Sequence, residues 1–332
     1  MSAHTLEWLN KNVLIGRTLK RGNAWHRKAS LQGEEPNHYE YAIPVEDVRR
    51  RLFHWDALKK EVFFEYADKM KFLEGKSAIV RDDTGEAFAI MSDAYQIHQH
   101  KKWLVDSVAN LLDDGLGIDS AGLLWGGAVA FVSVGIDENI TTKDGVEFRP
   151  NLLATTSHNG RIPTTYKRTS TLVVCDNTWN VALRGSGETF AIRHTKNSVL
   201  NIQTARNALG IVYETGDSIS QELERLCAIS VSDNQFQKVV NAILPMEHPD
   251  PRVVGRAKLQ NETLNFMWRE HEYCSPWYGT AFGAVQTFNT YRTHVAKVRS
   301  KTNRIERGFM DEITGKIKNA DEKIIRLLEM AG

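Results

Sequence analysis

Four residues that could act together in nucleophilic catalysis fall within one stretch of the chain, residues 151–195. Cys175 is the candidate nucleophile, His158 or His194 could accept its proton, and Asn177 could orient the histidine ring. Cys175 lies in an apolar run, however, where a buried and unreactive thiol is the more common outcome. Zinc binding by the cysteine and the two histidines lacks a closely spaced pair of ligands. The sequence therefore predicts no catalytic residue, no metal site and no cofactor.

The sequence also lacks the two common nucleotide-binding motifs. Gly185-Ser186-Gly187 is not part of a GxxxxGK[ST] loop, and no strand, GxGxxG turn and helix follow one another. ATP hydrolysis and dinucleotide binding therefore lose their usual support. An enzyme that acts on a nucleotide or nucleic acid through the Thr155–Gly160 turn and Cys175 remains an alternative hypothesis.

A polar turn stands after one of the predicted strands. Its six residues supply hydroxyl, imidazole and amide groups and a flexible glycine: Thr155, Thr156, Ser157, His158, Asn159 and Gly160. Such a turn can hold phosphates or bases. It can also be a hydrogen-bonded network that only stabilises the end of a strand. Both interpretations stay open at the level of sequence.

Basic and aromatic residues follow this turn and also stand near the N-terminus. Arginine and lysine contact phosphates, and aromatic rings stack on unpaired bases. The residues that we expect to contact nucleic acid are Arg161, Lys167, Arg168, Arg193, Tyr166, Trp25 and Arg27. Trp25 and Arg27 belong to an N-terminal segment that could equally be a solvated surface segment held to the core by its tryptophan.

The net charge of the chain is +1, from 42 Lys and Arg against 41 Asp and Glu, which argues against bulk attraction to nucleic acid or to an anionic membrane. The distribution is less even. Three segments are strongly basic: residues 11–28, 161–206 and 292–307. A basic surface therefore depends on whether these segments meet in space.

The cysteines and the longest apolar run limit the setting of the protein. Cys175, Cys227 and Cys274 are too few and too scattered for a disulfide scaffold, which favours a reducing cytoplasm. The N-terminus lacks the order of a signal peptide. The longest uncharged run, residues 120–136, is shorter than a membrane span and is interrupted by Gly126-Gly127. We expect a cytoplasmic protein with no membrane partner.

Periodicity predicts an α+β fold. Alternating and apolar runs, among them 61–66, 77–81, 86–91, 128–134, 148–156, 165–175 and 190–195, predict a mostly antiparallel sheet with flanking helices over residues 44–197. Helical periodicity dominates from 198 to 332. We expect an N-terminal arm (1–43), an α+β core domain (44–197) and a helical C-terminal region packed on that core (198–332).

A long helix and a short helix are also expected within the core. Residues 95–112 have a helical apolar face, on which His98 and His100 would point away from each other and lie at the surface. The short helix is expected to begin at Asp176 and continue to Leu183.

Six segments resemble a known family, the phage- and plasmid-borne bacterial proteins that carry the domain of unknown function number 932. They are LIGRTLKRGNAWH (Leu14–His26), NHYEYAIPVEDVRRRLF (Asn37–Phe53), TTSHNG (Thr155–Gly160), VVCDNTWNVAL (Val173–Leu183), IRHT (Ile192–Thr195) and GTAFGAVQTFNTY (Gly279–Tyr291). The resemblance implies a setting in mobile DNA and a bacterial host cell, and it supplies no catalytic residues.

The leading hypothesis is a non-enzymatic protein that binds single-stranded DNA in phage or plasmid replication or recombination. Its sheet would be the platform, and homo-oligomerisation is a secondary expectation from an outline resemblance to ring-forming annealing proteins. The alternatives are the enzyme described above and a protein that binds and modulates a host protein through the helical region.

Overall fold

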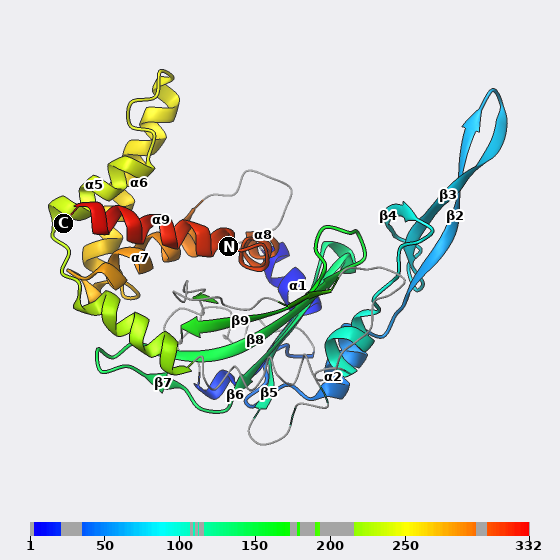
Figure 1. Cartoon of the computed structure of the whole chain (residues 1–332), viewed down its shortest axis with the longest axis horizontal. Coiled ribbons are helices and arrows are strands. Elements are labelled where there is room, and N and C mark those ends of the chain that lie inside the picture. The colour runs from blue at the N-terminus through cyan, green and yellow to red at the C-terminus, as the bar shows by residue number, and fades with distance from the viewer. Residues whose placement is uncertain are drawn as a thin grey trace.

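The computed structural model describes residues 3–20, 35–106, 109, 112, 116–172, 178–179, 190–192, 216–296 and 304–331. These parts form a mixed α+β fold with antiparallel sheets and a helical C-terminal region, as expected (Figure 1). No helix in these ranges is long and apolar enough to cross a membrane.

The larger sheet is antiparallel throughout. Neighbouring strands pair in the order β1 (Val13–Ile15), β5 (Leu116–Leu124), β6 (Val129–Ile136), β8 (Glu147–Ser157), β9 (Thr164–Leu172) and β10 (Thr178–Trp179). Two further strands lie off this path: β7 (Ile140–Thr141) pairs with β8, and β11 (Phe190–Ile192) pairs with β9. The apolar run of β6 is buried on both faces, as its lack of alternation predicts.

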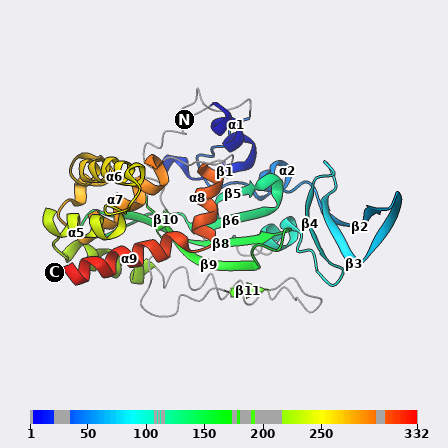
Figure 2. The same cartoon turned by 90° about the horizontal axis from the view of Figure 1, so that it is seen from above.

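Helices cover both faces of this sheet. On one face, α2 (Val45–Arg51) and a π-helix (Lys101–Asp106) pack against β5, β6 and β8. On the other, α1 (Ala3–Asn12) and α8 (Arg304–Ile313) enclose a smaller cluster, in which Phe131 stacks on Phe309 with ring centroids 4.6 Å apart. Figure 2 shows α8 lying across the strands. The sheet is therefore a buried middle layer.

A second sheet contains three strands, β2 (Ala57–Tyr66), β3 (Lys69–Arg81) and β4 (Ala87–Ser92). β4 pairs with β3 only from Lys76 to Val80, so the outer part of the β2–β3 hairpin stands alone and projects from the body (Figure 1). Ala67 and Asp68 have φ of 50° and 58° at its tip, the left-handed pair that a tight two-residue hairpin turn requires. We call residues Phe63–Phe72 the projecting hairpin.

The C-terminal region is helical where the structure describes it. After helical residues 216–228 come α5 (Asp233–Ile243), α6 (Pro251–Glu270), α7 (Ala281–Thr290), α8 and α9 (Lys316–Ala331). Ser232 and Gln235 form a reciprocal capping box at the start of α5. Every residue of α7 is buried, which makes it the central helix of this region.

Three local expectations need correction. The N-terminal segment is not an arm throughout, because residues 13–15 form β1 and pair with β5, and its short apolar VLI run gave little signal alone. His98 and His100 are buried rather than exposed, because the chain before the π-helix is irregular and turns both rings inward. Thr178–Trp179 is a strand paired with β9 where a helix was expected.

Candidate nucleic-acid interface

The first four residues of the polar turn, Thr155 to His158, are buried, whereas Asn159 is half-buried and Gly160 is exposed, and side chains of the turn hydrogen bond within the fold. Ser157 Oγ donates to the carbonyl oxygen of Ile162 at 2.7 Å, and the hydroxyls of Thr156 and Thr164 are 2.7 Å apart. Asn159 Oδ1 accepts the backbone N–H of Arg161 at 3.1 Å. These hydrogen bonds close the turn between β8 and β9. They match the interpretation of the turn as a network that stabilises the end of a strand.

His158 belongs to an aromatic cluster that joins the two sheets. Its ring stacks on His100 with centroids 3.9 Å apart and lies 5.7 Å from the rings of Trp55 and Phe88. Phe88 lies in β4, and Trp55 lies two residues before the start of β2. The turn whose sequence suggested ligand binding therefore holds the base of the second sheet, from which the projecting hairpin extends.

Further contacts fix this junction. Arg81 at the end of β3 donates from Nη1 to the carbonyl oxygen of Gly126 at 2.9 Å and lies over the Trp55 ring, 4.3 Å from its centroid. The Tyr95 hydroxyl donates to the carbonyl oxygen of Ser157 at 2.9 Å. Gly160 has a φ of 69°, and a Cβ there would lie 2.5 Å from the Met91 side chain of β4. A side chain at position 160 would therefore be strained by this left-handed backbone and would displace the end of the Met91 side chain.

The strand after the turn does not present its aromatic and basic residues as expected. Tyr166 is 2% exposed, and its hydroxyl donates to the carbonyl oxygen of Trp103 at 2.7 Å. Lys167 Nζ donates to the carbonyl oxygens of Glu312 and Ile313, at 2.9 and 3.2 Å, where α8 ends. Burial lowers the pKa of the Lys167 ammonium. The buried ring of Tyr166 is therefore not presented for stacking, which corrects that expectation, and the part-buried ammonium of Lys167 is held by the end of α8.

Of the other residues expected at the interface, one is described by the structure in full, one only by its backbone, and the rest not at all. Arg161 is exposed and lies over the Trp125 ring, 4.7 Å from its centroid. The backbone of Arg168 lies in β9, but its side chain is outside the described part of the chain. Also outside the described residues are Trp25, Arg27, Arg193, Cys175, Asn177 and His194.

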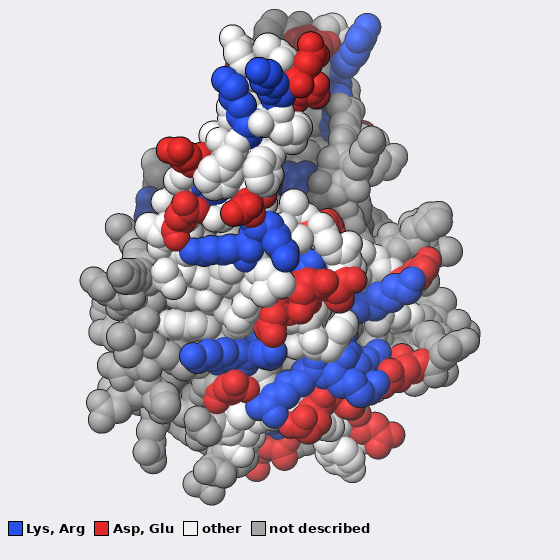
Figure 3. Space-filling model, turned by 90° about the vertical axis from the view of Figure 1, so that its right-hand side faces the viewer, with Lys and Arg blue, Asp and Glu red and all other residues white. Residues whose placement is uncertain are grey.

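Part of each basic segment lies in the described residues, and several cations there have acidic partners. Lys11 pairs with Glu7 at 2.8 Å, and Arg292 lies 3.5 Å from Asp321. Arg17 is buried against Asp119, with Nε 2.5 Å from Oδ1. Figure 3 shows, on the side that it faces, Lys and Arg interspersed with Asp and Glu rather than gathered in one basic field. Three cations of two basic segments, Lys11, Arg17 and Arg292, are therefore paired with acids within the fold.

The Arg17 contact belongs to a buried ionic cluster on the larger sheet. Arg149 Nη1 lies 3.9 Å from Asp119 Oδ2, and its Nη2 donates to Asn139. A Cβ on Gly135 would clash with Asp119 Oδ2, so the carboxylate fills the space above that glycine. Two guanidinium groups thus share one buried carboxylate, as buried charges require partners.

A second buried acid joins two helices of the C-terminal region. Asp321 of α9 lies 3.5 Å from both Asn289 of α7 and Arg292. Burial raises the pKa of the Asp321 carboxyl to about 7, although Arg292 acts in the opposite direction. Such a group can exchange a proton near neutrality, and here it links α7 to α9. The described residues contain no cluster of His, Cys, Asp and Glu suited to a metal ion.

The projecting hairpin, which sequence reasoning passed over as part of a small sheet, presents aromatic rings to solvent. Phe64 pairs with Lys71 and Tyr66 pairs with Lys69 across the strands, so these four residues share one face. Phe64 is 44% exposed and Tyr66 is 63% exposed. Lys71 Nζ lies 4.6 Å from the centroid of the Tyr66 ring. We call these four residues the aromatic–lysine face.

The opposite face of the hairpin has a different composition. Phe63 pairs with Phe72, with ring centroids 5.6 Å apart, and Glu65 pairs with Met70. Lysines therefore accompany the aromatic rings on one face only. The signal was present in the sequence as two alternating runs, FFEY and KMKF, either side of a two-residue turn.

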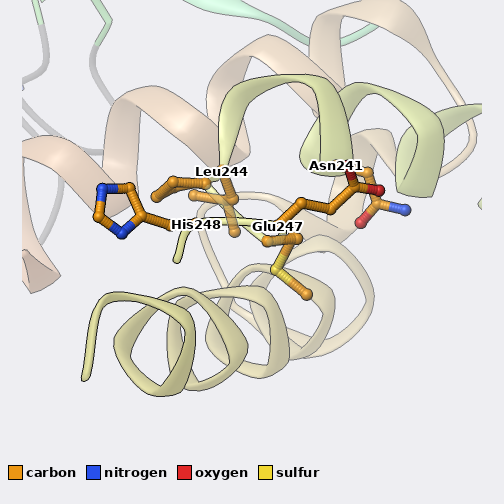
Figure 4. Close-up of a pocket in the computed structure, with 6 residues that line it drawn as sticks. Asn241, Leu244, Glu247 and His248 are labelled. Carbon is orange, nitrogen blue, oxygen red and sulfur yellow. The ribbon is translucent and has the colours of Figure 1, made fainter. Parts of the chain in front are cut away.

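A hollow of about 480 Å³ opens after α5 and is lined by Asn241, Leu244, Pro245, Met246, Glu247 and His248. Figure 4 shows the side chains of Glu247 and His248 pointing in different directions. The hollow therefore lacks convergent polar groups of the kind that mark a catalytic or cofactor site.

This chain combines a buried antiparallel sheet with a helical region and a projecting hairpin. The family model described as "Domain of unknown function (DUF932)" matches residues 87–309, about two thirds of the chain, and the chain belongs to this family. No curated protein matches it, and no solved structure matches it. This membership confirms the family resemblance seen in the sequence. The description of the family names no ligand.

Proposed function

We propose that this protein binds single-stranded DNA without catalysing a reaction, and that the aromatic–lysine face of the projecting hairpin is a principal contact. The observation that carries the proposal is the exposure of Phe64 and Tyr66 beside Lys69 and Lys71 on one face. Exposed aromatic rings on a projecting element indicate an interaction site, since apolar groups otherwise lower their free energy by burial.

The chemistry of the face favours unpaired bases. Phe64 and Tyr66 offer two ring surfaces, and each base stacked on an aromatic ring contributes about 1–3 kcal/mol to binding. Lys69 and Lys71 lie on the same face, where they can contact the phosphates that follow the stacked bases. A duplex hides its base faces, so we expect single strands to bind more tightly than duplexes.

Lysine placement also favours nucleic acid over an apolar protein surface as the partner. The apolar face with Phe63, Met70 and Phe72 has an acid, Glu65, beside its rings. The aromatic–lysine face has cations in the corresponding cross-strand positions. An exposed Arg161 above Trp125 is a further candidate for a phosphate contact.

The setting of this activity is part of the proposal. Replication or recombination of phage or plasmid DNA in the cytoplasm of a bacterium is supported only by the family resemblance, which is an association rather than a mechanism.

A polarisation titration of a labelled thymidine oligonucleotide at low salt tests the proposal. Phe64→Ala/Tyr66→Ala should weaken binding by about tenfold or more, since removing each stacking ring costs about 1–3 kcal/mol. Phe63→Ala/Phe72→Ala removes two rings from the opposite face of the same hairpin and should leave the affinity within about twofold, because exposed rings there do not contact the strand.

Two outcomes would overturn the proposal. One is the absence of binding by the unmodified protein at low salt. The other is an equal loss of affinity in both double variants, since that would show that the hairpin as a whole, and not the aromatic–lysine face, decides binding. Duplex DNA of the same length, measured in parallel, tests the preference for single strands.

A further inference from the structure

Helix α6 has one face without a partner in the described structure. Its buried residues are Ala257, Leu264, Met267 and Trp268, and all but Met267 belong to the core of the helical region. Its other face projects away from the larger sheet together with α5 (Figure 1). Leu259 is 64% exposed on this face and Phe266 is 61% exposed. Large apolar side chains in this position raise the question of what covers them.

The exposed residues of α6 are spaced as in a helix-pairing seam. Arg252, Gly255, Leu259, Glu262 and Phe266 follow one another at alternating steps of three and four residues. Gly255 stands in the helix interior, where glycine costs about 1 kcal/mol relative to alanine. A Cβ at this position would have no neighbour within 4 Å. Glycine here is therefore not required inside this chain, and it would allow a second helix to approach closely.

The charges along the seam are self-complementary. In two antiparallel copies of α6 that cross at Leu259, residues equally far before and after Leu259 lie opposite each other. Arg256 then faces Glu262 of the second copy, twice by symmetry. Arg252 faces Phe266 of the second copy, a pairing of a guanidinium with an aromatic ring. A surface that complements itself in this way is what a two-fold symmetric interface requires.

We propose that α6 is a docking surface for a second copy of this chain, packed antiparallel about Leu259. Neither Arg256 nor Glu262 has an ion pair within the described part of the chain, so both are available for this contact. Leu259 supplies the apolar centre. Since two apolar residues per copy bury little area, the dimer is weak and its population rises with protein concentration. The proposal does not depend on DNA binding.

Sedimentation velocity over a series of concentrations tests the dimer. Arg256→Glu places two acids opposite each other, and Glu262→Arg places two cations opposite each other. Each variant alone should raise the dimer dissociation constant by about fivefold or more, because exposed ion pairs of about 0.2–1 kcal/mol are replaced by repulsion at two symmetric positions. Both side chains are exposed, so folding measured by circular dichroism should not change.

Mixing the two variants gives the sharper result. A mixed dimer restores both ion pairs: the glutamate introduced at position 256 of one copy meets the arginine introduced at position 262 of the other, while native Glu262 meets native Arg256. An equimolar mixture should therefore dimerise about as well as the unmodified protein. A monomeric unmodified protein at the highest attainable concentration overturns the proposal. So does a dimer that neither substitution weakens, or a mixture that stays monomeric.

Discussion

Strand β9 and the projecting hairpin both carry tyrosine and lysine residues, and the two regions differ in how far these residues are exposed. In β9, Tyr166 and Lys167 are consecutive; Tyr166 is buried, and Lys167 is part-buried with its ammonium held at the end of α8. In the hairpin, Tyr66 and Lys71 share one face and are exposed. The difference lies in what covers each strand rather than in its composition.

This contrast indicates that β9 contributes to folding stability and that the projecting hairpin contributes to the proposed binding. Tyr166 fills core volume and donates a hydrogen bond, so its replacement should act on folding. Tyr66 contacts Lys71 and solvent, so its replacement should act on binding. Substitutions of the same chemical kind in the two regions therefore separate the two roles.

The largest expected effect is on folding. Tyr166→Ala should lower the free energy of unfolding, measured with urea, by about 3–5 kcal/mol, because it leaves a cavity in the core. Tyr66→Ala should change it by less than about 0.5 kcal/mol, as is usual for surface substitutions. Tyr166→Phe, which removes only the hydroxyl, should cost about 1 kcal/mol. A large loss from Tyr66→Ala would show that the hairpin is part of the folding core.

The comparison also shows which structural features could be predicted from the sequence. Alternation and apolar runs predicted β6, β8, β9 and β11 of the larger sheet, because side-chain period depends on local geometry alone, but they did not predict β1 or β5. The partial burial of Lys167 could not be predicted, since α8, whose last carbonyls it caps, lies about 145 residues later in the chain. The buried histidines were missed for a similar reason. His100 is placed by stacking on His158, a contact with no local signature.

Tertiary packing also explains why the candidate site is the projecting hairpin and not the Thr155–Gly160 turn. Hydroxyl, imidazole and amide groups in the Thr155–Gly160 turn suggested a ligand, but distant residues such as Tyr95 and Met91 pack against it. The alternation in the hairpin was visible, and only its projection from the body could show that no helix covers Phe64 and Tyr66. Sequence patterns state which side chains share a face, and tertiary packing decides whether solvent reaches that face.

A smaller effect is expected from pH, and it should be confined to buried charges. The Asp321 pKa of about 7 exceeds its ordinary value of 3.8, so between these values the folded protein binds a proton that the unfolded chain lacks. This contribution to stability is complete below about pH 4 and is lost as pH rises through 7. Asp321→Asn should therefore reduce the fall in unfolding free energy between pH 5 and 8, by an amount on the order of a few kcal/mol.

Glu65 of the hairpin is the matched control for this measurement. It is an exposed acid, so Glu65→Gln should leave the pH dependence of unfolding as in the unmodified protein. If Asp321→Asn leaves that dependence unchanged as well, the carboxyl is ionised in the folded protein, and the contact with Arg292 outweighs burial.

The smallest expected effect concerns salt. Removing one phosphate-binding cation from a complex with a single strand should reduce the slope of log affinity against log salt by about 0.7. Lys71→Met should show this reduction if its ammonium, exposed beside Tyr66, contacts a phosphate. Lys167→Met should leave the slope unchanged and lower the unfolding free energy instead, because its ammonium caps α8. Equal slopes for the two variants would mean that Lys71 contributes no phosphate contact, and the proposed binding would then rest on stacking by Phe64 and Tyr66 alone.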